Sequence, residues 1–255
     1  MTGVSRGLGR SLAKQLRESG FSICALSRSG SLAACADVSD NCLTWDCALP
    51  WEKNDFAAIH DFCGQNSVVG FIHAAGVLGP MDKTPLPLES MAWKRWWDDF
   101  HAALAINFTS GSQLVHAVLP YLKKESSTSG KLRTPFVVHL SSGAALKPYA
   151  GWNAYCSAKA AMLMEFKCLA AQRKPDDVLV LSVAPGTVMT DMMRQVLSAR
   201  PEDFPAIAKF KELEKNGGLV SPDSAAQKIC EWLTQSSFEE LKNCHGELYD
   251  VRSKS

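Results

Sequence analysis

Strand-length apolar runs alternate with amphipathic helical stretches along the chain, and this alternation restricts the fold more than any other feature. The apolar runs cover 21–27, 42–46, 68–74, 134–141, 178–184 and 246–250. The helical patterns cover about 7–19, 54–64, 89–123, 152–174 and 223–235, with shorter pieces near 189–199 and 203–214. Strands that alternate with helices form parallel sheets, and right-handed crossovers place the helices on both faces. We therefore expect an α/β fold.

The length and charge of the chain exclude several classes of protein. Its 255 residues suffice for one large domain over 1–255, and we find no linker or internal repeat. The 27 basic and 26 acidic side chains nearly balance, which argues against nucleic acid or an anionic membrane as principal partner. The apolar runs are shorter than the ~20 residues of a membrane helix. The nine cysteines lack the spacing of a zinc site. We expect a cytoplasmic protein without a metal site, with an exposed loop at Ser126–Arg133.

Glycines cluster at the amino end, directly before the first expected helix. The segment Thr2–Gly9 spaces them as Gly-x-x-x-Gly-x-Gly, and it lacks the lysine of an ATP-binding phosphate loop. Glycines let a backbone approach a pyrophosphate closely, and the N–H groups and dipole at a helix start hold the negative charge. This pattern predicts a dinucleotide phosphate site at the start of the helix.

A tyrosine and a lysine one helical turn apart offer proton-transfer chemistry. Tyr155 and Lys159 leave the same helix face, so we expect the ammonium to lower the pKa of Tyr155 from ~10 toward neutral. Ser142 follows the apolar run Phe136–Leu140, which places its hydroxyl at the carboxyl edge of a strand, where ligands bind in α/β sheets. These groups suit the reduction of a carbonyl, with Tyr155 as general acid.

Further motifs follow these in a fixed order along the chain. They are the glycine-rich loop, His73-Ala-Ala-Gly76, Asn107, Ser142, Tyr155 with Lys159, and Pro185-Gly186-x-x-x-Thr190. In this order the chain resembles the short-chain dehydrogenase/reductase family over nearly its whole length. The resemblance implies a Rossmann-type doubly wound sheet and a nicotinamide cofactor. His73 stands where relatives usually have asparagine, and we expect it to brace the loop beneath the cofactor.

The resemblance also implies a role for each matching residue. Hydride passes from the nicotinamide to a ketone carbon, Tyr155 protonates the alkoxide and Ser142 stabilises the oxygen. Lys159 also holds the nicotinamide ribose, and Asn107 carries a water that links Lys159 to solvent. The expected cofactor contacts are Gly3, Ser5, Arg6, Gly7, Leu8, Gly9, Arg28, Asp46, Ala74, Ala75, Gly76, Tyr155, Lys159, Pro185, Gly186, Val188 and Thr190.

The residues after the family's second strand, here the run 21–27, select between the two nicotinamide cofactors. Ser27 and Arg28 stand there, with no acid to hold a ribose diol. Arg6 supplies a second guanidinium, and two such groups suit a 2′-phosphate, so we expect NADPH. Either arginine alone is equally typical of a solvated surface. Asp46 matches the family's adenine contact, although a capping role suits it equally.

Within the family, the likeness is strongest to the sepiapterin-reducing members. It rests on 140–161, 184–192 and 219–228, and the Pro-x-x-Gly-Trp-x-x-Tyr-Cys stretch is shared with carbonyl reductases that act on benzil-like diketones. It implies reduction of a pterin side-chain ketone in tetrahydrobiopterin synthesis, with a benzil-like diketone as the alternative. Ser142, Tyr155, Gly186, Met192 and Glu247 are the expected substrate contacts, Glu247 replacing an aspartate that anchors the pterin. The segment 190–218 is the expected substrate lid.

Relatives in this family carry an apolar strand directly before the Thr-Gly pair, and here only Met1 precedes Thr2. We therefore expect the sheet to lack its usual first strand, so that nothing bridges the two neighbouring strands at its centre. This leaves a third possibility, a catalytically impaired binding protein of the same fold.

The helices that carry Asn107 and Tyr155 resemble those that form a dimer bundle in this family, so we expect a homodimer. Trp93, Trp96, Trp97 and Phe100 share one helix face, which favours core or subunit packing over a substrate cage.

Overall fold

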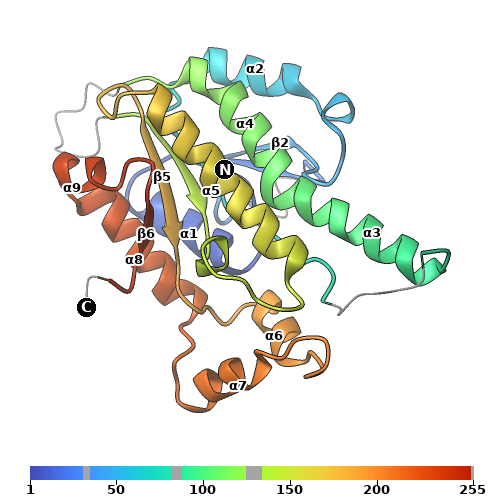
Figure 1. The fold of residues 1–255 in the computed structure, drawn as a ribbon. Helices are drawn as coiled ribbons and strands as arrows, with labels where there is room; N and C mark the ends of the chain where they lie inside the picture. Colours follow the sequence, from blue (N-terminus) through green and yellow to red (C-terminus); the bar gives the residue numbers. More distant parts are fainter. Residues whose placement is uncertain (31–34, 82–87, 125–133, 254–255) are drawn as a thin grey trace.

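Helices cover both faces of a parallel sheet in the computed structural model, which describes residues 1–30, 35–81, 88–124 and 134–253 (Figure 1). The strands are β1 (Cys24–Ser27), β2 (Asn41–Thr44), β3 (Gly70–His73), β4 (Phe136–Leu140), β5 (Leu179–Ala184) and β6 (Leu248–Asp250). The ladders between them are parallel, with the orders β1-β2 and β3-β4-β5-β6. The expected α/β fold is confirmed. The loop expected at Ser126–Arg133 lies outside the described residues.

The helices fall close to the expected positions. They are α1 (Gly7–Glu18), α2 (Phe56–Gln65), α3 (Met91–Leu104), α4 (Ser110–Val118), α5 (Asn153–Gln172), α6 (Asp191–Leu197), α7 (Ile207–Lys215), α8 (Pro222–Gln235) and α9 (Phe238–Lys242). The single helix expected over 89–123 is interrupted by a π-helical turn at Ala105–Thr109. Such turns often occur at functional sites, and this one carries Asn107.

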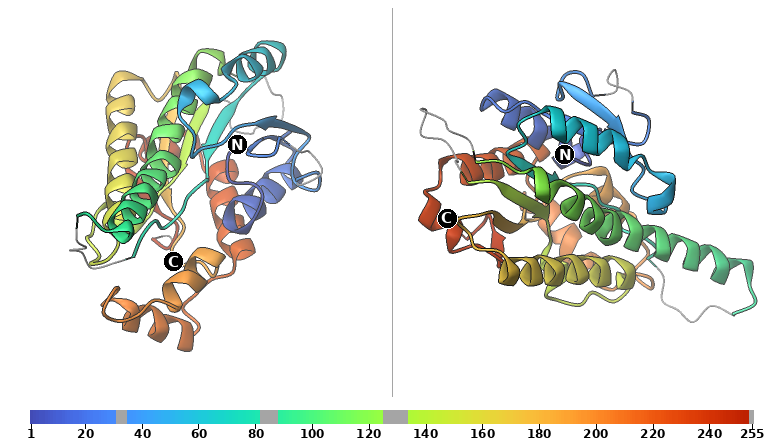
Figure 2. Two further views of the ribbon diagram at one scale, coloured as in Figure 1. Left: turned by 90° about the vertical axis from the view of Figure 1, so that its right-hand side faces the viewer. Right: turned by 90° about the horizontal axis from the view of Figure 1, so that it is seen from above.

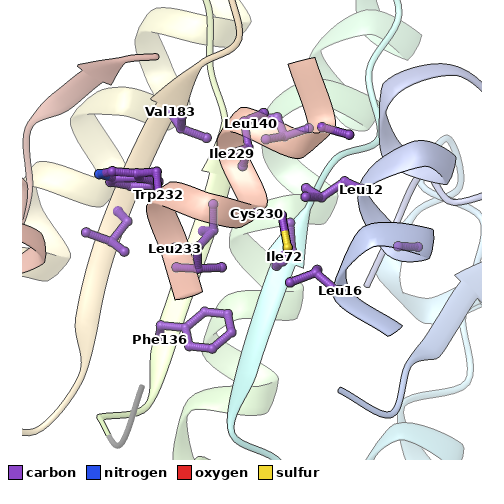
Figure 3. Packing of buried hydrophobic residues seen from close by; sticks show 14 of the residues in the cluster. Leu12, Leu16, Ile72, Phe136, Leu140, Val183, Ile229, Cys230, Trp232 and Leu233 are labelled. Carbon is purple, nitrogen blue, oxygen red and sulfur yellow. The ribbon is translucent and has the colours of Figure 1, made fainter. Parts of the chain in front are cut away.

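One face of the sheet is covered by α1 and α8, which pack against each other. Figure 3 shows Leu12 and Leu16 of α1 and Ile229 and Leu233 of α8 directed at apolar side chains of the strands. Burial of each such side chain stabilises the fold by roughly 1.5–3 kcal/mol. Helix α1 ends where Gly20 adopts a φ of 89°, a left-handed conformation that glycine adopts without strain.

The opposite face is covered by α2, α4 and α5, drawn in cyan, green and yellow in the left view of Figure 2. Every residue of β4 and β5 is buried. A strand covered on both faces needs a nearly continuous apolar sequence rather than an alternating one, which explains the run Leu179–Ala184. Among the described residues no helix is long and apolar enough to cross a membrane.

The amino terminus lies inside the sheet, between β1 and β3 (Figures 1 and 2). Thr2 forms parallel bridges with Leu26 on one side and His73 on the other. The Thr2 N–H donates to the Ile72 carbonyl at 3.1 Å, and the Leu26 N–H donates to the Met1 carbonyl at 2.8 Å. The expectation that nothing bridges the centre of the sheet is therefore wrong at its carboxyl edge, because Met1 and Thr2 supply one short stretch of strand there.

Candidate active site

A cavity of about 960 Å³ follows the carboxyl edge of the sheet. The ends of both parts of the sheet contribute to its wall, from Ser27 at the end of β1 to Ser142 after β4 and Gly186 after β5. All the residues expected to take part in catalysis or to hold cofactor or substrate line this cavity except Asn107 and Glu247. The carboxyl edge is where parallel α/β sheets bind ligands, so this cavity is the candidate active site.

The glycine-rich loop and the start of α1 form one end of the cavity. Helix α1 has no acidic residue in its first turn, and Arg6 at its N-cap makes no side-chain capping hydrogen bond. The first N–H groups of α1 are therefore available to an anion. Gly3 has a φ of 72°, and a Cβ built on it would lie 2.6 Å from the Ala74 carbonyl carbon. A side chain at this position would push the loop from β3, so the loop geometry fits the pyrophosphate of a dinucleotide.

Arg6, Arg28 and Asp46 all line the cavity. Both arginines are exposed, and Arg6 Nη1 lies 3.7 Å from the carboxylate of Asp191 on α6. Asp46 Oδ1 accepts a hydrogen bond from the Ala48 N–H at 2.9 Å. The aspartate thus caps a turn and also lines the cavity. Both positions agree with its two expected roles, as a cap and as a contact to adenine.

Tyr155 and Lys159 are buried on α5, and Ser142 follows β4. Lys159 Nζ donates to the Leu140 carbonyl at 2.8 Å and lies 5.7 Å from the centre of the Tyr155 ring. Burial raises the pKa of Tyr155 to about 12, against a smaller opposite effect of a hydrogen bond with Ser142. Burial also lowers the pKa of Lys159 to about 8. The expectation that Lys159 brings the pKa of Tyr155 toward neutral is therefore wrong here, because desolvation disfavours both charged forms.

Asn107 is buried behind the cavity wall, in the π-helical turn. Its amide donates to the carbonyls of Val77 and Ala103, each at 2.8 Å, and accepts from the Val77 N–H at 3.2 Å. A Cβ built on Gly76 would lie 3.0 Å from Asn107 Oδ1 and 3.7 Å from Lys159 Nζ. The amide and the ammonium are thus close neighbours, and the amide also fixes the loop after β3.

His73 joins the amino terminus to this loop. Its Nδ1 lies 3.0 Å from Thr2 Oγ1, and its Nε2 lies 3.1 Å from the Ile106 carbonyl. Burial lowers the pKa of His73 to about 3, so the ring is neutral and donates from Nε2 to the carbonyl. The Thr2 hydroxyl can then donate to Nδ1 while it accepts from the N–H groups of Ala74 and Ala75 at 3.1 and 3.2 Å. The expected bracing role of His73 is confirmed.

Aromatic side chains line the cavity beside Tyr155, and sequence reasoning did not select them. Tyr149, Trp152 and Phe210 contribute to the wall. The Trp152 ring stacks on Phe204 at 4.6 Å and meets the Tyr155 ring edge-on at 5.6 Å. The Gly-Trp pair in the most specific motif was the available signal. Helix α7 carries Phe210, and residues of α6 and α7 both line the cavity. The role of the segment 190–218 as a substrate lid stays a prediction.

The last strand brings a different carboxylate to the cavity from the one expected. Glu247 does not line the cavity, and its carboxylate accepts from Lys167 Nζ of α5 at 3.0 Å. Asp250 and Arg252 line it instead, and Arg252 Nε donates to Asp250 at 2.9 Å. The Arg252 hydrogen bond holds the pKa of Asp250 below its usual value. The reason is positional, since Glu247 precedes β6 whereas Asp250 ends it at the ligand-binding edge.

The sheet, the glycine-rich loop and the Ser142, Tyr155 and Lys159 side chains together define an oxidoreductase that acts on CH–OH or C=O groups with a nicotinamide cofactor. The sequence model of the family described as "short chain dehydrogenase" matches residues 1–201, and the chain belongs to this family.

Two kinds of curated relative resemble the chain. Benzil reductase ((S)-benzoin forming) of Bacillus subtilis is 29% identical over 99% of this chain and 97% of its own length. Sepiapterin reductase of Mus musculus is 33% identical over 70% of this chain and 62% of its own length.

Solved structures agree with this assignment at the level of the fold. The KRED1-Pglu enzyme has a TM-score of 0.73 at 24% identity, covering 97% of this chain and 98% of its own. A short chain dehydrogenase of Shigella flexneri, complexed with NADP, has a TM-score of 0.71 at 20% identity, covering 98% and 95%.

Proposed function

We propose that this protein is an NADPH-dependent reductase of vicinal diketones that carry an aromatic group, the benzil type. The observation that carries this proposal is the aromatic wall of Tyr149, Trp152 and Phe210 beside the Tyr155 phenol. Offset or edge-on contacts between aromatic rings add ~0.5–1.5 kcal/mol to the burial of their area. A benzil reductase and a sepiapterin reductase each match nearly the whole chain at 29% identity, so the relatives fit either substrate and the aromatic wall decides the order of the two candidates.

Each side chain of the site has its own role in the reduction of the carbonyl group. NADPH, when bound, supplies the hydride. The Ser142 hydroxyl is placed to donate to the substrate oxygen and so to stabilise the charge that develops there. Tyr155, whose pKa of about 12 keeps the phenol protonated, delivers the proton to that oxygen. Lys159 lies close enough to favour the phenolate that remains, and Asn107 holds the loop beside it.

The preference for NADPH rests on the positive charge that lines the cavity. Arg6 and Arg28 both line it, and no acidic residue occupies the position directly after β1. Two guanidinium groups suit the 2′-phosphate that distinguishes NADPH from NADH.

A pterin ketone remains a second candidate because of Asp250. This carboxylate lines the cavity at the end of β6, where it could accept hydrogen bonds from the N–H groups of a pterin ring. It would first have to share or release its contacts with Arg252. A ring that merely stacks on Trp152 needs no such change, and for that reason we place the diketone first.

A homodimer is part of the same proposal. Helix α3 packs against α5, and apolar side chains on both helices are exposed, including Met91, Trp97 and Met164. Exposed apolar groups on adjacent helices are typical of subunit contacts. Size-exclusion chromatography with light scattering would test this directly, and a monomer at micromolar concentration would exclude it.

Activity is tested by the decrease of NADPH absorbance with four substrates: benzil, sepiapterin, a small aliphatic diketone and acetophenone. We expect the highest kcat/KM for benzil, and little reaction with the monoketone acetophenone. Tyr155→Phe serves as the inactive control. A higher kcat/KM for sepiapterin would favour the second candidate. NADPH binding without turnover of any carbonyl compound would instead identify a non-catalytic binding protein of this fold.

A further inference from the structure

Among the described residues that line the active-site cavity, three basic side chains have no role in the proposed reaction: Lys147, Lys209 and Arg252. Lys209 belongs to α7, drawn in orange in Figure 1, and Arg252 follows β6. Both lie beside Tyr149, because the Lys209 ammonium is placed over its ring and the Arg252 guanidinium interacts electrostatically with its phenol. The aromatic wall that we expect to hold the substrate therefore carries two cations beside Tyr149.

The two carboxylates that line the cavity from α6 and β6 already have cationic partners. Asp250 accepts hydrogen bonds from Arg252 Nε at 2.9 Å and from Arg252 Nη2 at 2.5 Å. Asp191 accepts a hydrogen bond from Arg194 Nη1 at 2.6 Å. Lys209, in contrast, forms no ion pair within the ranges that the structure describes. Its charge therefore stays uncompensated, and a cavity wall with such a positive charge attracts anions.

A row of aromatic contacts connects the proton donor with this ammonium. The Tyr155 ring lies 5.6 Å from the Trp152 ring, and the Trp152 ring lies 4.9 Å from the Tyr149 ring. The Lys209 Nζ lies 5.8 Å from the centre of the Tyr149 ring, where the ring electrons attract it. A substrate whose carbonyl is held at Tyr155 can therefore place an aromatic ring along this wall, with the far side of that ring toward Lys209.

We propose that Lys209 binds a carboxylate on the far side of the substrate's aromatic ring, so that the preferred substrates are aromatic vicinal diketones that carry such a group. The inference rests on the proposed function, because it names the substrates of the same site. An ammonium has three N–H donors, and one or two of them suffice for a carboxylate. Lys209 is exposed, so salt should weaken this preference.

The test compares benzil-4-carboxylate with benzil-4-carboxamide, which has nearly the same shape and no charge. We expect a kcat/KM at least about fivefold higher for the carboxylate at an ionic strength of about 20 mM, and a ratio near one in about 0.5 M KCl. The decrease of NADPH absorbance gives both values. Equal kcat/KM values at low ionic strength overturn the carboxylate site and leave the proposed diketone reductase intact.

A binding measurement separates the carboxylate site from the reaction. If neither compound is reduced, the proposed function fails, and the quenching of tryptophan fluorescence in the full chain then gives the Kd of each compound. A Kd at least about fivefold lower for the carboxylate at low ionic strength supports the site without the reaction. Equal Kd values overturn the site as well.

A pair of variants on α7 locates the site. Lys209→Met removes the ammonium and nearly keeps the length of the side chain, whereas Lys211→Met makes the same change at an exposed position outside the cavity wall. The ratio of kcat/KM for the carboxylate to that for the carboxamide should fall to near one in the first variant and keep its parent value in the second. Each ratio is taken within one protein, so a general loss of activity cancels. A parent-like ratio in Lys209→Met, or the same fall in both variants, overturns the proposal.

Discussion

The two sides of the sheet differ in how firmly their strands are held. On the β3–β6 side, β4 and β5 are buried at every residue and pair along their whole length. On the other side, no residue of β2 is fully buried, and β1 meets the rest of the sheet through Met1 and Thr2. Tyr155 and Lys159 belong to the first side, whereas the glycine-rich loop and Arg28 belong to the second.

This difference indicates that the proton-transfer groups and the phosphate-binding groups are held in position by different parts of the fold. Lys159 is fixed by the Leu140 carbonyl, which belongs to a fully paired strand. The loop after Thr2 is fixed chiefly by the hydrogen bonds of one threonine hydroxyl. Loss of the proton donor on the first side should therefore change catalysis and leave cofactor affinity intact, whereas variants on the second side should change cofactor affinity. Variants on the two sides test whether catalysis and cofactor binding depend on separate parts of the fold.

The largest effect is expected at Tyr155 on the firmly held side. Tyr155→Phe removes the proton donor and should lower kcat by two or more orders of magnitude, at least ~2.7 kcal/mol of transition-state stabilisation. The affinity for NADPH should hardly change, as measured by fluorescence titration. Tyr149→Phe is the matched control, because it removes a hydroxyl from the same cavity. Unchanged kcat in Tyr155→Phe would remove this residue as the acid.

Thr2→Val tests the weakly held side with an isosteric change. It leaves His73 Nδ1 without a donor and the N–H groups of Ala74 and Ala75 without this acceptor, in a buried site. Each buried group left unsatisfied costs about 1–3 kcal/mol, so we expect a loss of roughly 2–3 kcal/mol in urea unfolding and weaker NADPH binding. Thr234→Val, which removes a single bond within α8, should cost less. An equal loss of unfolding free energy in both variants would show that the Thr2 hydroxyl does not hold the loop as we infer.

The sequence predicted the strands, the order of motifs and nearly all of the cavity lining, because those features depend on local pattern. It did not predict which carboxylate near the last strand lines the cavity, since Glu247 lies just before β6 and Asp250 ends it, only three positions apart in the sequence. It also did not predict that burial would dominate the pKa of Tyr155, because burial is set by tertiary packing. The π-helical turn at Asn107 was missed for a similar reason, since helical periodicity continues across it.

The buried ammonium of Lys159 predicts a pH dependence of stability. Its pKa falls from 10.5 to about 8 on folding, so the unfolded chain binds more protons between these values and stability rises with pH. Relative to Lys159→Met, the protein should gain about 2 kcal/mol between pH ~8 and ~10, as measured by urea unfolding. Burial raises the pKa of Cys24 to about 11, which acts in the opposite direction but is common to both proteins. A flat difference between the two proteins would mean that Lys159 is hydrated.

The last prediction concerns the two exposed arginines that line the cavity. Changing Arg6 and Arg28 to Ala should raise the Kd for NADPH by well over tenfold and hardly alter the Kd for NADH, because charge-assisted hydrogen bonds are worth ~1.5–3 kcal/mol each. Arg17→Ala is the matched control, since Arg17 forms an ion pair with Asp40 at the far end of α1. Urea unfolding of the double variant should match that of the parent. Equal weakening of both cofactors would show that the arginines support the loop rather than the phosphate, and the weakly held side would then act as one structural unit.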